Sequence, residues 1–379
     1  MRLFRCNRCL YPNTKPDLHF DEDGLCSACQ AFDARQKIDW KAKEAEFVDL
    51  VKSNAGKTHD VIVACSGGKD STWQVVKCLE LGLKPLAVTA TTDHLTELGR
   101  RNLNNISKLC DHIEVTPHTP TRKKISTFAL REVGDISWCE HHLIWSVPAR
   151  EAIARNIPIV LYGECPQNEY GAGPKGSENE TQLTKAWVHE FGGLLGLRLT
   201  DISEILDIEL RQLEIYQYPK GASAYFMGSF FPWDGYQNYL DALQHGFTPH
   251  HAESIGCHEN LDNAQTGIHD HLRFLKFGYT REDDIISSHI RRGRMTRADG
   301  AAKAFAGRPD YKYYLGIPRR HILGPLYISE EEYAEICERF TNREVVEWAS
   351  QPESYQSCST MTTDASKESN STQTVASAA

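Results

Sequence analysis

Residues 66–71, Ser-Gly-Gly-Lys-Asp-Ser, combine residue types that bind phosphate. An apolar run at 61–65 precedes them, and a helical spacing of Trp73, Val76 and Leu79 follows. This pattern predicts a strand, a glycine turn and a helix. Such a unit directs backbone N–H groups and the positive end of a helix dipole at one point, which suits an anion. The stretch predicts a nucleotide phosphate site; a plain Gly-Ser turn after a buried strand is the alternative.

Each residue type in this loop has an expected role. Gly67 and Gly68 let the backbone approach phosphate without an intervening Cβ. The hydroxyls of Ser66 and Ser71 can donate hydrogen bonds to the same phosphate oxygens. Asp70 would repel phosphate directly, so we expect it to hold a magnesium ion that bridges the phosphates. The loop is too short to be the G-x-x-x-x-G-K-[ST] loop of ordinary NTPases.

Two Cys-x-x-Cys pairs lie near the start of the chain, Cys6 with Cys9 and Cys26 with Cys29. Their spacing matches a structural zinc site with four thiolate ligands. A segment this short has little core, so metal binding would supply its folding free energy. A redox pair or an iron–sulfur cluster is the alternative, but a redox Cys-x-x-Cys needs a thioredoxin-like βαβ context that is missing here.

Strand and helix patterns alternate up to residue 162, which predicts an α/β fold with a doubly wound parallel sheet. The predicted strands are 61–65, 85–90, 113–116 and 157–162. In such sheets ligands gather at the carboxyl ends of the strands. We therefore expect the second strand, with Ala87 and Thr89, to border an adenosine. The loop after the fourth strand begins with Gly163 and Glu164 and is predicted to be a second active-site loop, with a solvated connection as the alternative.

Beyond residue 180 the strand signal fades, and we expect a mostly helical C-terminal region with helices at 201–216, 269–277 and 331–348. The candidate substrate-binding residues are Asn168, Glu169, Tyr170, Trp233, Asp234, Arg281, Asp284 and Arg291. Arg291 belongs to a cluster with Arg292, Arg294 and Arg297. Guanidinium groups can pair with a diphosphate or a carboxylate; a solvated helix face, or a helix end at Gly293, is the alternative.

The chain has 379 residues, of which 40% are hydrophobic and 25% charged, and its net charge is −9. The acidic balance argues against a large nucleic-acid footprint. No run reaches the roughly 18 apolar residues of a membrane span, and the start lacks the apolar core of a signal peptide, so we expect a cytoplasmic protein. The expected parts are a zinc-binding segment (1–35), the sheet domain (36–195), a helical substrate or partner region (196–349) and a disordered tail (350–379).

The loop SGGKDS resembles the pyrophosphatase loop of the PP-loop ATP pyrophosphatases, whose fold is adenine nucleotide alpha-hydrolase-like. With the cysteine pairs and the segments GECPQNEYG, FFPWD and FGYTREDDIISSHIRRGRMTR, the chain resembles the bacterial N-acetyl sugar amidotransferases. These take part in making amidino sugars for surface polysaccharides. The resemblance covers residues 1–345 and implies a sheet of this type preceded by a zinc ribbon.

The resemblance also implies a reaction in lipopolysaccharide or O-antigen biosynthesis. ATP would adenylate the acetamido oxygen of a nucleotide-linked sugar and release pyrophosphate, and ammonia would then displace AMP to give an acetamidine. Lys69, Asp70 and Glu164 would be catalytic, with ATP, Mg²⁺ and structural Zn²⁺ as cofactors. Because the sequence shows no glutaminase motif, ammonia would come from a separate glutaminase that acts with a barrel-shaped, cyclase-like partner.

Two other functions compete with this one. A tRNA-thiolating PP-loop enzyme would need a basic face and catalytic cysteines. Cys139 and Cys165 could be recruited, but they form no Cys-x-x-Cys pair, and the net charge opposes it. A non-catalytic nucleotide-binding scaffold is the third possibility. ATP-dependent release of pyrophosphate would separate it from either enzyme.

Overall fold

A six-stranded sheet forms the centre of the protein, with the strand order β3-β2-β1-β4-β6-β5. The computed structural model describes residues 2–171, 180–191, 197–251, 255–306 and 311–356. The strands are β1 (Val61–Ala64), β2 (Pro85–Ala90), β3 (Asp111–Val115), β4 (Ile159–Tyr162), β5 (Gln182–Leu183) and β6 (Ser223–Phe226). All pairings are parallel except that of β5 with β6. This order places β1 and β4 in the middle, where loops can converge on one site.

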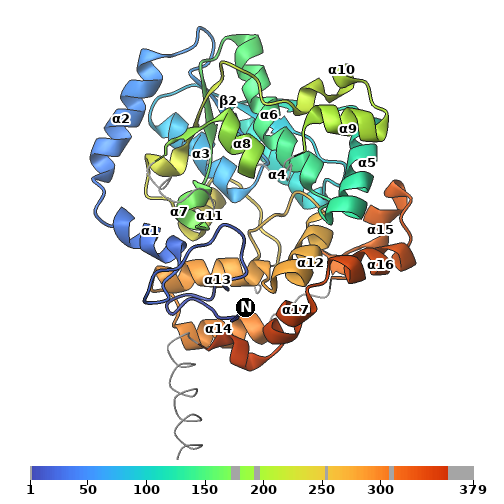
Figure 1. The fold of residues 1–379 in the computed structure, drawn as a ribbon. Coiled ribbons are helices and arrows are strands. Elements are labelled where there is room, and N and C mark those ends of the chain that lie inside the picture. Colours follow the sequence, from blue (N-terminus) through green and yellow to red (C-terminus); the bar gives the residue numbers. More distant parts are fainter. Residues whose placement is uncertain (1, 172–179, 192–196, 252–254, 307–310, 357–379) are drawn as a thin grey trace, which may run out of the picture.

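Helices cover both faces of this sheet (Figure 1). They are α2 (Trp40–Ser53), α3 (Lys69–Glu80), α4 (Glu97–Leu109), α5 (Thr119–Phe128), the π-helix η1 (Ala129–Val133), α6 (Trp138–Arg155), α7 (Pro166–Glu169) and α8 (Lys185–Phe191). Successive side chains of β1 point to opposite faces. Val63 shares an apolar cluster with Phe47 of α2 and Val75 of α3, whereas Ile62 belongs to a second cluster with Leu143 of α6. The predicted doubly wound α/β fold is confirmed.

The sheet extends beyond residue 195, where we expected its domain to end. Strand β6 pairs in parallel with β4, from Ile159 opposite Ser223 to Tyr162 opposite Phe226. The sequence pattern missed this strand because it is short and runs into an aromatic segment whose glycine and proline indicate a loop. Phe226 is fully buried. The aromatic segment therefore contributes a strand to the sheet before it reaches the site.

The C-terminal region is mostly helical, as predicted, but its helices are shorter and more numerous. They are α9 (Leu199–Leu206), α10 (Leu210–Leu213), η2 (Glu214–Tyr216), η3 (Met227–Ser229), α11 (Gly235–Gln244), α12 (Thr266–Phe277), α13 (Arg281–Arg291), α14 (Arg297–Ala306), α15 (Arg320–Leu323), η4 (Gly324–Leu326), α16 (Glu330–Phe340), α17 (Arg343–Ala349) and η5 (Pro352–Tyr355), with a small hairpin of β7 (Tyr313–Tyr314) and β8 (Ile317–Pro318). The helix predicted at 331–348 is two helices, because Asn342 caps a new one by accepting the Val345 N–H. Asp207, at a positive φ of 47°, ends α9 inside the predicted 201–216 helix.

The two ends of the described chain lie together (Figure 1). The cysteine segment and α1 (Ser27–Arg35) pack beside α13 and α14. The first residues of the predicted disordered tail are ordered instead: Tyr355 of η5 is buried, and the Arg5 guanidinium lies 4.1 Å from its ring centre. The rest of the predicted tail lies outside the described residues.

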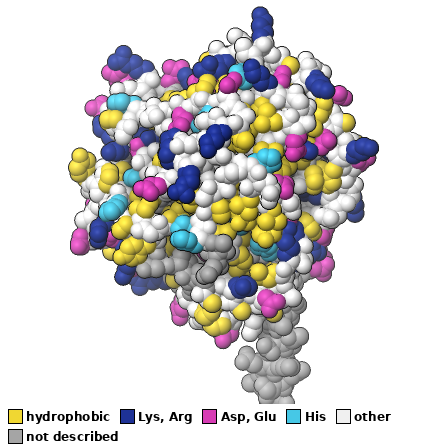
Figure 2. All heavy atoms as spheres, turned by 180° about the vertical axis from the view of Figure 1, so that it is seen from behind, with side chains coloured by type: hydrophobic (Ala, Val, Ile, Leu, Met, Phe, Trp, Pro, Cys, Tyr) yellow, Lys and Arg dark blue, Asp and Glu magenta, His cyan; other side chains and the backbone are white. Residues whose placement is uncertain are grey.

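No helix in the described ranges has the length and apolar character needed to cross a bilayer. On the face shown in Figure 2, acidic and basic side chains are interspersed, and apolar side chains gather near its centre.

Candidate active site

A cavity of about 660 Å³ opens at the carboxyl ends of the central strands. Its wall includes Cys65 after β1, Thr91 after β2 and Gly163 after β4. The opposite wall comes from α12, α13 and the segment before α12. Parallel α/β sheets bind ligands at this edge because their strand-to-helix loops converge there. The cavity therefore lies between the sheet and the C-terminal helices.

Most of the residues predicted as site residues line this one cavity. From the expected ATP side these are Ser66, Gly68, Lys69, Asp70, Ser71, Thr89, Gly163 and Glu164; from the expected substrate side they are Glu169, Tyr170, Trp233, Arg281, Asp284 and Arg291. Residues more than two hundred positions apart in the sequence thus face the same space. The arrangement allows two ligands to meet there.

Four predicted residues lie outside the cavity wall. Ala87 is fully buried in the cluster between the sheet and α2. Asn168 is buried in α7. Asp234 caps α11 and pairs with Arg294 at 2.6 Å. Gly67 has a positive φ of 81°, and a Cβ there would lie 2.9 Å from the Leu103 backbone nitrogen. Glycine is thus required at position 67 because the backbone has a positive φ and because α4 packs closely against it. The requirement does not come from a phosphate approaching the backbone.

Gly68 has the geometry expected of a phosphate-binding glycine. It lines the cavity and precedes the first turn of α3, so the positive end of that helix faces the site. A Cβ at Gly68 would meet only the Ser66 hydroxyl oxygen, at 3.2 Å. Ser71 donates to the Gly68 carbonyl oxygen, which fixes the turn. The Gly68 N–H donates to the Ser66 hydroxyl at 3.3 Å, and the start of α3 lies in the cavity wall, a position that suits an anion.

Lys69 is a buried cation held between two carboxylates at the start of α3. Its ammonium group lies 2.6 Å from Asp70 Oδ2 and 2.8 Å from Glu259 Oε1, and its side chain is 5% exposed. Burial lowers the pKa of Lys69, but Asp70 and Glu259 outweigh it and raise the pKa well above its ordinary value. Asn238 of α11 donates to the other Asp70 oxygen at 2.9 Å. Lys69 is therefore held as a cation at the mouth of the loop.

Glu164 is the second carboxylate near the loop. Burial, and then the charge of Asp70, raises the pKa of Glu164 to about 7. Asp70, Glu164 and Glu259 supply the oxygen ligands that Mg²⁺ prefers. In the described parts of the chain, however, the four cysteines are the one group of three or more His, Cys, Asp or Glu ligands close enough to hold an ion. A magnesium ion here would therefore need phosphate oxygens to complete its ligands, which is the usual arrangement for Mg²⁺-nucleotides.

The arginine cluster divides between different partners. The helix ends at Arg291, and Gly293 at a φ of 70° turns the chain. Arg291 lines the cavity and donates to the Glu169 carbonyl oxygen. Arg292 pairs with the Glu169 carboxylate at 2.8 Å. Arg297 donates to the carbonyl oxygens of Cys6 and Tyr355. Neither the shared helix face nor the solvated face describes these arginines, because Arg291 and Arg292 both bind Glu169, whereas Arg297 binds the cysteine segment and η5.

A histidine–carboxylate pair in the cavity was not found from the sequence. His269 Nδ1 lies 2.9 Å from Asp135 Oδ1, and His141 lies 3.9 Å from the other Asp135 oxygen. Both histidines line the cavity. Burial raises the pKa of Asp135, but His269 outweighs it and lowers the pKa below its usual range. The contact between His269 Nδ1 and the Asp135 carboxylate fixes the orientation of the imidazole ring.

Sequence reasoning also missed Glu140 and Glu259. Burial raises the pKa of Glu140 to about 7, and Glu140 accepts hydrogen bonds from Thr92 and Asn263. Glu259 belongs to no motif, and its role follows only from its contact with Lys69. The spacing of Asp135 and His269 carries no signal either, because the turn before α6 and helix α12 meet only in the folded chain.

The four predicted cysteine ligands form one buried group. Cys6, Cys9, Cys26 and Cys29 are fully buried, and their sulfurs all lie within 4.8 Å of one another. The Cys9–Cys26 and Cys6–Cys29 sulfur distances are 3.6 and 3.9 Å. A tetrahedral ion with Zn–S bonds of about 2.3 Å would place its sulfurs about 3.8 Å apart. The donor set and its dimensions therefore fit Zn²⁺.

Known proteins resemble parts of this chain to different degrees. The sheet order and the loop after β1 define an α/β protein with a strand–loop–helix unit at the cavity. Residues 234–361 match the family model described as "LPS biosynthesis protein WbpG-like, C-terminal domain". For this part of the chain, the match confirms the relationship with lipopolysaccharide-biosynthesis proteins that the sequence indicated.

The other two comparisons add less. No curated protein matches the chain. Among solved structures, the chain is similar to NMN synthetase from Francisella tularensis, at 14% identity over 55% of this chain and 92% of that chain, with a TM-score of 0.29.

Proposed function

We propose that this protein is an ATP-dependent amidotransferase of surface-polysaccharide biosynthesis. It converts the acetamido group of a nucleotide-linked sugar into an acetamidine and releases AMP and pyrophosphate. One observation carries the proposal: the phosphate-type loop and the segment that matches the lipopolysaccharide family face the same cavity. An enzyme that activates a sugar with ATP needs both ligands in one enclosed space.

The residues of the loop end would bind and orient ATP. Backbone N–H groups at Gly68 and the positive end of α3 would hold the phosphates, and the Lys69 ammonium group would stabilise negative charge as pyrophosphate leaves. Bound Mg²⁺ would neutralise phosphate charge, and Asp70 and Glu164 are the residues that would hold it. Trp233 and Tyr170 in the cavity wall can stack on a ring of the sugar nucleotide.

The second half of the reaction needs a base. After ammonia adds to the adenylated carbon, the new C–N bond carries an ammonium nitrogen that must lose a proton. AMP then leaves with the electrons of the C–O bond, and the product is an acetamidinium. His269, oriented by Asp135, is the residue we assign to accept this proton. Ammonia would be supplied by a separate glutaminase acting with a cyclase-like partner.

The competing tRNA-thiolation function finds little support. Cys139 and Cys165 are buried outside the cavity wall. Burial raises the pKa of the Cys165 thiol to about 11 and raises that of Cys139 further above its ordinary value. A thiol with a raised pKa is a weak nucleophile at neutral pH.

Mass spectrometry of nucleotide sugars tests the proposal. Purified protein is incubated with Mg-ATP, ammonium and a panel of nucleotide-linked N-acetyl sugars. The expected product carries NH in place of one oxygen, together with equal amounts of AMP and pyrophosphate. Pyrophosphate release without this mass change would indicate a different acceptor, and absence of ATP turnover with every sugar would favour a non-catalytic nucleotide-binding protein.

A further inference from the structure

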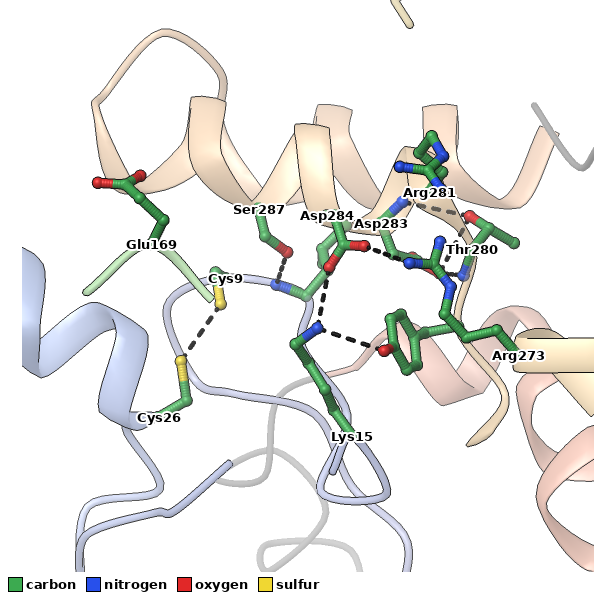
Figure 3. A network of polar contacts seen from close by, with 12 residues as sticks. Cys9, Lys15, Cys26, Glu169, Arg273, Thr280, Arg281, Asp283, Asp284 and Ser287 are labelled. Carbon is green, nitrogen blue, oxygen red and sulfur yellow. Dashed lines mark hydrogen bonds and ion pairs between the residues drawn. The ribbon is translucent and has the colours of Figure 1, made fainter. Parts of the chain in front are cut away.

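Lys15, from the N-terminal cysteine segment, forms part of the active-site wall. Its side chain is buried and lines the cavity. Its ammonium group lies 3.2 Å from Asp284 Oδ1 of α13 and 3.3 Å from the Tyr279 hydroxyl (Figure 3). It also lies 4.8 Å from the ring centre of Tyr11 and 5.7 Å from that of Tyr170. The contacts with Asp284 and with three tyrosines therefore fix the position of the Lys15 charge in the cavity wall. No sequence motif indicated this lysine.

The loop between the two cysteine pairs is fixed to α13 at several points. The Leu10 N–H donates to the Ser287 hydroxyl, and Arg5 pairs with Asp283 where both side chains are essentially fully buried. Arg5 also donates to the Leu10 carbonyl oxygen at 2.6 Å. Figure 3 shows Lys15 and Cys9 on this same segment, beneath α13. The four-cysteine group therefore holds the chain that delivers Lys15 to the cavity.

This end of the cavity contains more positive than negative charge. Its cations are Lys15, Arg273, Arg281 and Arg291, and its neighbouring anions are Asp270 and Asp284. Glu169, which also faces the cavity, is paired with Arg292. Arg273 Nε and Arg291 Nη1 are buried and make no hydrogen bond. Lys15 and Arg273 share the Asp284 carboxylate, and Arg281 pairs with Asp270. A further anion could accept hydrogen bonds from the unused N–H groups of Arg273 and Arg291, whose burial without a partner is costly.

We propose that Lys15, with Arg273 and Arg291, forms a recognition site for the anionic oxygens of the sugar substrate, and that the metal state of the four-cysteine site controls this binding. Both phosphate and carboxylate oxygens can accept hydrogen bonds from these cationic groups. The inference rests on the proposed function only for the identity of the substrate. It goes beyond that function in making the cysteine segment part of the binding site rather than a separate structural unit.

Lys15→Met tests the role of Lys15 in anion binding without an expected loss of folding. Asp284 keeps Arg273 as a partner at 3.0 Å, so removing the lysine charge does not leave a buried carboxylate unpaired. Lys52→Met, on the exposed last turn of α2, is the matched control. Lys15→Arg, which keeps the charge, should recover part of the binding. A merely structural role for Lys15 would not depend on ligand charge.

Isothermal titration of the metal-loaded protein with three probes provides the test. UDP carries phosphates, glucuronate carries a carboxylate, and uridine carries neither. We expect Lys15→Met to weaken UDP, glucuronate or both by about ten- to a hundredfold, with uridine and Mg-ATP unchanged; the probe affected identifies the anion. Failure of the wild type to bind either anion, equal binding by Lys15→Met, or an equal loss of Mg-ATP binding would overturn the proposal.

Metal removal tests the coupling. In protein treated with a chelator under reducing conditions, we expect anion affinity to fall at least as far as in Lys15→Met and amide hydrogen exchange to rise in α13, while Mg-ATP affinity is retained. Unchanged anion binding without metal would refute the coupling. These measurements use no turnover, so a failed sugar assay would count against the proposed function and leave this result standing.

Discussion

The ammonium nitrogen of Lys69 lies 2.8 Å from Glu259 Oε1, which joins the loop after β1 to the segment before α12. The Lys69 side chain is 5% exposed and that of Glu259 22%. Burial raises the pKa of Glu259, but Lys69 and then His258 outweigh it and lower the pKa below its ordinary value. The contact therefore links the proposed ATP side of the cavity to the proposed substrate side.

A double-mutant cycle with Lys69→Met and Glu259→Gln measures this link. We expect a coupling free energy of about 1–3 kcal/mol in urea unfolding, because the pair is largely shielded from water. Lys43 and Glu46 of α2 form a control pair at a similar distance, 2.7 Å, but with side chains 34% and 53% exposed. That pair should give about 0.5 kcal/mol or less. Equal couplings for the two pairs would contradict the role we give to Glu259.

Substitution of Gly67 should affect folding stability, whereas substitution of Gly68 should affect ATP binding. Gly67→Ala places a side chain at a positive φ and against the Leu103 backbone, so we expect a loss of about 1–3 kcal/mol in folding stability. Gly68→Ala meets only the Ser66 hydroxyl, so folding should be nearly unchanged. Its methyl group would occupy phosphate space and weaken ATP binding by about tenfold or more. Thermal unfolding and ATP titration of both variants check this, and normal ATP binding by Gly68→Ala would remove the loop assignment.

The titration of Glu164 predicts a pH-dependent stability. Folding raises the pKa of Glu164 from 4.5 to about 7, so the folded state favours the protonated form. This contribution to stability is fully present below about pH 4.5 and is lost as the pH rises through 7. At about 1.36 kcal/mol per pKa unit the loss is at most about 3.4 kcal/mol, and less because solvent reaches part of the side chain.

Glu164→Gln should therefore be more stable than the wild type above pH 7 and lose this advantage toward pH 4.5. Glu335→Gln, on the exposed face of α16, should follow the wild type at every pH. Thermal unfolding of the three proteins without nucleotide between pH 4.5 and 8 provides the measurement. Parallel curves for Glu164→Gln and the wild type would show that the carboxyl group is not perturbed.

The four-cysteine group predicts about one zinc ion per chain. Cys26→Ser removes one buried ligand and should lower both zinc content and melting temperature. Cys110→Ser changes a partly buried thiol outside the group and should leave the zinc content unchanged. Metal analysis of protein purified without chelator, combined with thermal unfolding, checks both variants. Folded wild-type protein with no bound metal would exclude the site.

The local patterns of the sequence were sufficient for the strand–loop–helix unit and the cysteine group. The run before Ser66 forms β1, and Lys69 begins α3, because β-branched residues, glycines and helical spacing act over a few positions. The cysteine spacing indicated a four-ligand site for a similar reason: each Cys-x-x-Cys pair bends the chain around one ion. Such features depend on neighbours in the sequence.

Tertiary structure alone decided which distant residues share the cavity. Lys15, Glu259 and His269 carry no motif, and their roles arise from contacts with Asp284, Lys69 and Asp135 across the fold. Strand β6 was likewise set by pairing with β4 rather than by its own pattern. The physical reason is common to all of these: long-range hydrogen bonds, ion pairs and burial are properties of two surfaces brought together, and a linear sequence specifies each surface without showing where it meets the other.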